Sequence, residues 1–103
     1  MPTMMYKSLA GKKRFTRLVG CHGKLKGMRC GLVVLKPKES VGEHTTGHKE
    51  EGIIILKGHA KVSWGRKSIS VGEKSFLYIP RHTVHNMQNS GREPLKYVYV
   101  TVA

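Results

Sequence analysis

Histidines and a neighbouring acid are the residues in this sequence whose types and spacing best suit metal chemistry. Four of the six histidines fall in two short polar stretches. The first stretch contains His44 and His48 and ends at Glu51, and the second contains His82 and His85. Imidazole nitrogens and carboxylate oxygens are common ligands for zinc, iron, nickel and manganese. The clustering therefore predicts one metal site built from both stretches.

Both stretches border apolar segments, so strands must bring these side chains to a common point. Alternate residues of an extended chain share a face, which would put His44, Thr46 and His48 together. His59 follows a glycine at an expected turn and His22 lies beside a cysteine. We interpret these last two histidines as surface residues.

The hydrophobic pattern beyond residue 27 is typical of short strands separated by turns. The expected strands are 28–35, 52–56, 60–64, 68–71, 75–79, 84–89 and 95–102. No stretch shows a helical period, and turn residues recur every eight to twelve positions, which predicts an all-β, antiparallel sandwich or barrel. In the last strand, Leu95, Tyr97, Tyr99 and Thr101 share one face.

The apolar strand residues must either line the interior or pack on the outside, and alternation alone does not distinguish the two faces. These residues include Ile53, Ile55, Val62, Trp64, Phe76, Tyr78, Met87, Tyr97 and Tyr99. Aromatic side chains of this kind more often belong to a core than to a ligand-stacking surface.

The length of 103 residues predicts one domain with one modest core. In residues 1–20 the apolar residues follow neither the helical period nor the alternation of a strand, and Lys and Arg are frequent. This indicates a basic N-terminal arm or edge strand. Residues 21–103 are then expected to form a single β-barrel domain.

The charge is strongly unbalanced, with 19 Lys and Arg against six acidic residues, for a net charge of +13. Such a surface attracts anions and makes nonspecific contact with nucleic acid plausible. Aromatic residues make up only 7% and no basic–aromatic motif is present, so a nucleic-acid function is not favoured. An anionic small molecule is the preferred partner.

The longest apolar run, residues 53–56, is far too short to cross a membrane. The N-terminus has no apolar signal-peptide core, so we expect no membrane association and a cytoplasmic location. The two cysteines, Cys21 and Cys30, are interpreted as reduced thiols, with a hairpin disulfide as the alternative.

The first polar stretch matches half of a two-part family motif. Glu51 is followed by six residues and then Gly58, and counting back from Glu51 gives Thr46 and His44 at the two preceding ligand positions. The second stretch matches the other half, with Gly72, Pro80, His82, His85 and Asn89 in order. In these residues the chain resembles the small single-domain cupins, over about residues 28–102.

The resemblance implies a jelly-roll (double-stranded β-helix) barrel that holds a divalent transition metal, with Zn, Fe, Mn or Ni as candidates. Carried over by position, His44, Glu51 and His85 are ligands. Thr46 stands where the family has a second histidine, and His82 stands where it has a turn glycine. His48 or His82 could restore the fourth ligand. Otherwise two histidines and one carboxylate remain, as in ferrous oxygenases with open positions.

Two functions follow from the resemblance. The first is a metal-dependent enzyme of the isomerase or epimerase, dioxygenase or decarboxylase type, acting on a small polar or anionic substrate. In this case an unliganded His48 or His82 could act as general base. The second is a noncatalytic module that binds a small ligand or a metal. The resemblance also implies a homodimer.

Overall fold

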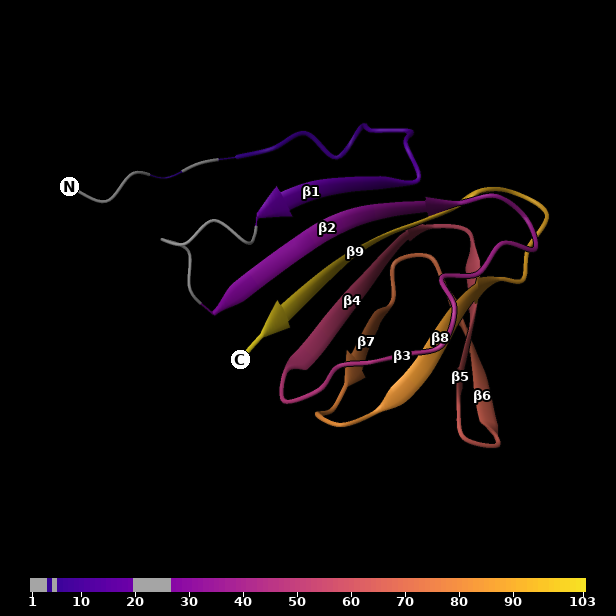
Figure 1. The fold of residues 1–103 in the computed structure, drawn as a ribbon. Helices are drawn as coiled ribbons and strands as arrows, with labels where there is room; N and C mark the ends of the chain where they lie inside the picture. Colours follow the sequence, from indigo (N-terminus) through magenta and orange to yellow (C-terminus); the bar gives the residue numbers. More distant parts are fainter. Residues whose placement is uncertain (1–3, 5, 20–26) are drawn as a thin grey trace.

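The computed structural model describes residues 4, 6–19 and 27–103, which form nine strands and no helix (Figure 1). The strands are β1 (Phe15–Val19), β2 (Met28–Leu35), β3 (His44–Thr45), β4 (Glu50–Lys57), β5 (His59–Trp64), β6 (Lys67–Gly72), β7 (Phe76–Ile79), β8 (Val84–Asn89) and β9 (Leu95–Val102). Within the described residues, no helix is long and apolar enough to span a membrane.

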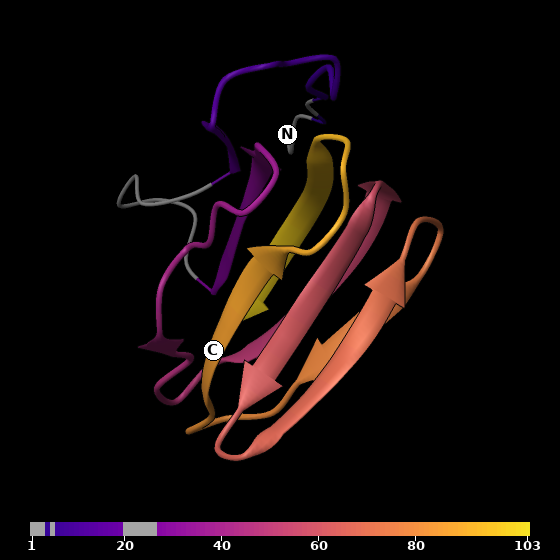
Figure 2. The same ribbon diagram turned by 90° about the vertical axis from the view of Figure 1, so that its right-hand side faces the viewer.

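The strands form two antiparallel sheets that face each other. One has five strands in the order β1-β2-β9-β4-β7, and the other has four in the order β3-β8-β5-β6 (Figures 1 and 2). The all-β antiparallel prediction is confirmed, and strands 28–35, 84–89 and 95–102 have the bounds expected from the sequence. β4 is longer than expected because it begins at Glu50, where Glu50 and Glu51 already pair with β9.

The core lies between the two sheets and follows the alternation of each strand. In β9, Leu95 and Tyr97, which were predicted to share one face, are both buried. Phe76 and Tyr78 of β7, whose direction the sequence left open, lie on the outside and are 67% and 53% exposed. The fully buried apolar side chains include Leu35, Ile53, Ile55, Val62, Met87 and Leu95.

Part of the basic N-terminal segment joins the barrel. β1 pairs with β2 at the edge of the five-stranded sheet, with Phe15 opposite Val33. The segment before β1 crosses the outer face of β2, where Gly11 lies against the fully buried Leu32. Arg14 anchors this segment through an ion pair with Glu39 at 3.2 Å. The division of the chain at residue 20 stays a prediction, and Cys21 and His22 lie outside the described residues.

Gly58 of the motif ends β4 in a conformation that a larger residue would resist. Its φ is +86°, and a Cβ there would lie 2.7 Å from the carbonyl oxygen of Pro94. Glycine is therefore required both by the left-handed backbone and by the close approach of the β8–β9 connection. This explains the glycine that follows Glu51 by six residues in the motif.

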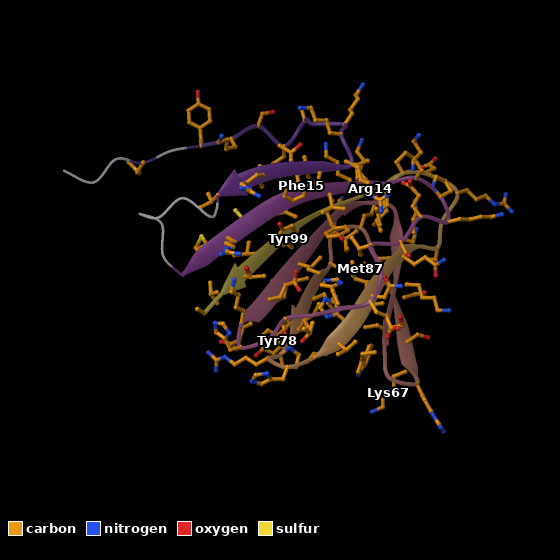
Figure 3. The ribbon with its side chains drawn as sticks, in the orientation of Figure 1. Arg14, Phe15, Lys67, Tyr78, Met87 and Tyr99 are labelled. Atoms are coloured by element: carbon orange, nitrogen blue, oxygen red, sulfur yellow. The ribbon has the colours of Figure 1, made fainter. Side chains whose placement is uncertain are left out.

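Gly31 of β2 makes room for two aromatic rings. Phe15 and Tyr99, on the strands either side of β2, stack with ring centroids 6.3 Å apart (Figure 3). A Cβ at Gly31 would lie 2.7 Å from each ring. We expect Gly31→Ala to lower the free energy of unfolding by about 1–3 kcal/mol, measured by urea denaturation, because both rings must move.

Gly72→Ala is the matched control, since it also lies in a strand and its Cβ would have no neighbour closer than 3.4 Å. We expect it to change the free energy of unfolding by less than about 1 kcal/mol. Equal losses in the two variants would contradict the steric role of Gly31.

Candidate metal centre

Three of the predicted ligands come together at one end of the barrel. His44, Glu51 and His85 offer ligand atoms that all lie within 4.8 Å of one another. His44 and His85 are direct register partners on β3 and β8, while Glu51 comes from β4 of the facing sheet. The histidine–glutamate group, as we call these three residues, therefore joins the two sheets.

The imidazole of His85 is buried and has its two nitrogens in different environments. The side chain is 1% exposed, and Nδ1 lies 3.0 Å from the Thr83 carbonyl oxygen, to which it can donate. Nε2 lies 3.3 Å from Oε1 of Glu51 but has no hydrogen-bond partner of acceptable geometry. With the proton on Nδ1, a nitrogen lone pair faces a carboxylate oxygen, and both are acceptors.

A positive charge between these two acceptor atoms would stabilise the arrangement. Burial lowers the pKa of His85, but the adjacent Glu51 carboxylate and the Thr83 carbonyl together outweigh burial and raise the pKa above its ordinary value. A proton between Nε2 and the carboxylate would satisfy both atoms, and so would a divalent metal ion. Imidazole and carboxylate suit zinc, iron, manganese or nickel, so the residues present fit such a metal.

His44 is also oriented for ligation by a backbone acceptor. Its Nδ1 lies 2.9 Å from the Gly42 carbonyl oxygen, and its ring centroid is 4.3 Å from that of His85 at an interplanar angle of 56°. A histidine that donates one N–H to a carbonyl keeps the other nitrogen available for a metal. Because the His44 side chain is exposed, it forms the solvent side of the group.

The adjacent acids of β4 are separated by the alternation of the strand. Glu51 points into the barrel and is nearly buried, whereas Glu50 accepts a hydrogen bond from Tyr78 and lies 3.7 Å from Arg81. The hydrogen bond to Glu50 raises the pKa of the Tyr78 hydroxyl. Glu51 is thus the acid directed at the histidines, as the motif predicts.

Thr46, at the family's second histidine position, holds the loop before His85 through two hydrogen bonds. Its hydroxyl donates to the Pro80 carbonyl at 3.0 Å and accepts from the backbone N–H of Thr83 at 3.3 Å. Thr83 in turn provides the carbonyl that orients His85. The threonine therefore acts on the site through the loop that holds His85.

Neither alternative histidine lies in the histidine–glutamate group. His48 lines a cavity beside this group but its side chain is exposed, and its backbone carbonyl accepts a hydrogen bond from Arg81 at 2.9 Å. His82 is exposed with a φ of 58°, a left-handed conformation of the kind that a turn glycine adopts readily. His82 thus keeps the backbone role of the glycine it replaces.

A cavity of about 560 Å³ opens beside the histidine–glutamate group. Its polar and charged lining residues are Arg29, His44, Thr45, Thr46, His48, Lys49, Glu51, His85 and Thr101, and its apolar wall includes Phe15, Val33, Ile53, Met87, Tyr97 and Tyr99. Burial raises the pKa of the Tyr97 hydroxyl, so this group stays protonated and neutral. The cavity can accept a small molecule next to the candidate ligands.

Our sequence interpretation missed Arg29 and Lys49 as cavity residues. The signal was present in the strand that begins at residue 28, where Arg29 has the same parity as the inward-facing Val33 and Leu35. Only the pairing of that strand with β9 reveals that this face lines the cavity.

Two facing antiparallel sheets around a histidine–carboxylate group define a small β-barrel protein with a pocket suited to a metal. Residues 31–101 match the cupin domain family, and the chain belongs to that family. The double-stranded β-helix expected from the resemblance is thereby confirmed together with the family.

Solved structures agree on the fold. An RmlC-like cupin family protein with a double-stranded β-helix fold from Methanocaldococcus jannaschii superposes with a TM-score of 0.81 at 19% identity, covering 99% of this chain and 92% of that chain. A predicted oxalate decarboxylase from Thermotoga maritima gives a TM-score of 0.77 at 20% identity, covering 85% and 77%.

Curated relatives are much longer proteins. Mannose-1-phosphate guanylyltransferase RfbM of Salmonella typhimurium is 33% identical over 73 residues, which are 71% of this chain and 15% of the relative. Mannose-1-phosphate guanylyltransferase 2 of Escherichia coli is 32% identical over 69 residues, 67% of this chain and 14% of the relative. The chain thus spans about one seventh of the length of these relatives.

Proposed function

We propose that this protein binds a divalent transition metal through His44, Glu51 and His85 and uses the adjacent cavity for a small polar or anionic molecule. The observation that carries the proposal is Nε2 of His85, which is buried, lacks a hydrogen bond and faces the Glu51 carboxylate at 3.3 Å. A metal bound there would supply Lewis-acid chemistry, or dioxygen activation if the metal is iron.

The residues of the chain have distinct roles in this proposal. The carbonyls of Gly42 and Thr83 fix the two imidazoles with their Nδ1 protons outward, so that each Nε2 is free to ligate. Three protein ligands would leave room in the metal's coordination shell for a small molecule. His48 lines the same cavity without joining the group, so it could hold or move a proton as a general base.

Cupin enzymes of the isomerase or epimerase, dioxygenase or decarboxylase type are the reaction classes we consider. A small acid is in keeping with the similarity to a predicted oxalate decarboxylase, and a sugar phosphate with the similarity to mannose-1-phosphate guanylyltransferases. The net charge of +13 favours an anionic substrate in either case.

A noncatalytic module that binds a small ligand or metal is the second candidate. Thr46 favours it, because the residue at the family's second histidine position is engaged with the Pro80–Thr83 loop instead of a metal. The relatives also contain this region as a minor part of a larger protein.

Turnover distinguishes the two candidates. Protein loaded separately with zinc, iron, manganese and nickel is incubated with sugar phosphates, oxalate and small diketones, and products are followed by NMR. An enzyme is expected to convert one of these compounds with one metal, and Glu51→Gln is expected to lower kcat by more than about 100-fold. Metal binding and ligand binding without turnover would favour the noncatalytic module.

We also propose a homodimer through the outer face of the five-stranded sheet. That face exposes Ile54, Phe76 and Tyr78, and Ile54 and Phe76 are register partners. Two chains that each carry +13 repel each other, so the proposed contact would depend on burying these apolar side chains. Sedimentation of the wild type and of Phe76→Glu tests this, with a dimer and a monomer as the expected results.

A cytoplasmic location accompanies this proposal as the expected setting for a metal-dependent pocket acting on a small metabolite. Nonspecific contact with nucleic acid through the basic residues is the weaker prediction. It would appear as binding to a nonspecific duplex that falls steeply with salt.

A further inference from the structure

We propose that Arg29 and Lys49 form an oxyanion subsite at the exposed edge of the cavity, which binds the phosphate or carboxylate group of a small molecule. The inference rests on the proposed function for the identity of the pocket, but the subsite itself consists of protein side chains. It names the substrate class more narrowly than the overall charge does. The ligand must carry an oxyanion at the end remote from the metal ligands.

The strand register places Arg29 and Glu51 in one cross-strand row. Arg29 of β2 pairs with Thr101 of β9, and Thr101 pairs with Glu51 of β4. All three residues line the cavity, so their side chains share the inner face of the sheet. Two strand spacings put the Cα atoms of Arg29 and Glu51 about 10 Å apart. Because the Arg29 side chain is long, a ligand of only a few atoms would reach from its guanidinium group to the histidine–glutamate group.

Lys49 approaches the same end of the cavity from the start of β4. It lies two residues before Glu51 and lines the cavity with it. Arg29 lies on β2 and Lys49 lies immediately before β4, and these two strands flank β9. A ligand held between them and that group would be a small molecule, because it spans one end of one cavity.

These two cations lack acidic partners in the described part of the chain. The ion pairs there are Arg14–Glu39, Arg81–Glu50 and His85–Glu51, and the side chains of Arg29 and Lys49 make no hydrogen bond or ion pair with the described residues. Glu51 is the single acid among the lining residues of the cavity. The cationic edge of the cavity is therefore not neutralised by the lining itself.

Guanidinium chemistry specifies what the subsite accepts. Arg presents a rigid fork of donors that matches the two oxygens of a carboxylate or phosphate, and such charge-assisted pairs are stronger than neutral hydrogen bonds. Lys adds a point charge with freely oriented donors. Together they favour a terminal oxyanion over an uncharged sugar or a cation.

The test is calorimetric titration of the whole protein with inorganic phosphate and, separately, with acetate at low ionic strength, with and without zinc. We expect Arg29→Gln to weaken phosphate binding by about tenfold or more. Arg29→Lys keeps the charge without the fork and is expected to weaken it less. The more tightly bound probe identifies whether phosphate or carboxylate is the preferred group.

Lys67→Gln removes one positive charge from the start of β6, and Lys67 does not line the cavity (Figure 3). We expect this control to leave phosphate affinity unchanged. Wild-type affinity in Arg29→Gln and Arg29→Lys, or an equal loss in Lys67→Gln, would overturn the subsite. Phosphate binding that depends on Arg29 in a protein unable to bind zinc would instead refute the metal proposal and leave the subsite standing.

Discussion

His85→Ala is expected to weaken zinc binding by more than about 100-fold, measured by competition with a chromophoric chelator. Even residues that only orient a metal ligand typically contribute 10–100-fold to affinity, and a direct ligand should contribute at least as much. His85 is also the most deeply buried member of the histidine–glutamate group, and its loss removes the nitrogen opposite Glu51.

His59→Ala is the control for that experiment. His59 begins β5, is exposed and does not line the cavity. We expect its zinc affinity to match that of the wild type. If His85→Ala bound zinc as tightly as the wild type did, the metal would have to reside elsewhere in the chain.

Asn89→Ala is expected to lower the free energy of unfolding by about 3–5 kcal/mol, since several buried polar groups would lose their partners at once. Asn89 is 1% exposed, and its Nδ2 donates to the carbonyls of Leu35 at 2.9 Å and Glu93 at 2.8 Å. Its Oδ1 accepts from the Gly91 N–H at 2.9 Å. One side chain thus joins the end of β2 to the connection between β8 and β9.

Urea denaturation measures the effect, with Ser90→Ala as the control. Ser90 is the exposed neighbour of Asn89, and among the described residues its hydroxyl makes a single long hydrogen bond, at 3.5 Å, to the His59 carbonyl. We expect this variant to stay within about 0.5 kcal/mol of the wild type. If both variants were equally stable, the hydrogen bonds of the Asn89 side chain would not contribute to the stability of the fold.

Much of the site could be predicted from spacing because the two motif stretches lie next to strands with clear bounds. Glu51 and His85 fall on strands whose alternation directs them inward, and His44 pairs directly with His85. The roles of Thr46 and His82 required coordinates, since they depend on hydrogen bonds and a left-handed φ that residue type alone does not encode.

The cationic edge of the cavity illustrates a different limit. Arg29 is far from Glu51 in sequence, and its proximity depends on the register of β2 with β9 and of β9 with β4. A shift of one residue in either pairing would turn Arg29 outward. Periodicity within a strand predicts which residues share a face, but it does not predict which residue of another strand lies opposite.

The most direct test of the central claim is a crystal structure of the protein purified without chelators, with diffraction recorded on both sides of the absorption edge of the metal found by elemental analysis. The account predicts one anomalous peak per chain between His44, Glu51 and His85, absent from crystals of His85→Ala. A well-ordered site that contains no peak after soaking in zinc, iron, manganese and nickel, or a peak bound only by other residues, would contradict it.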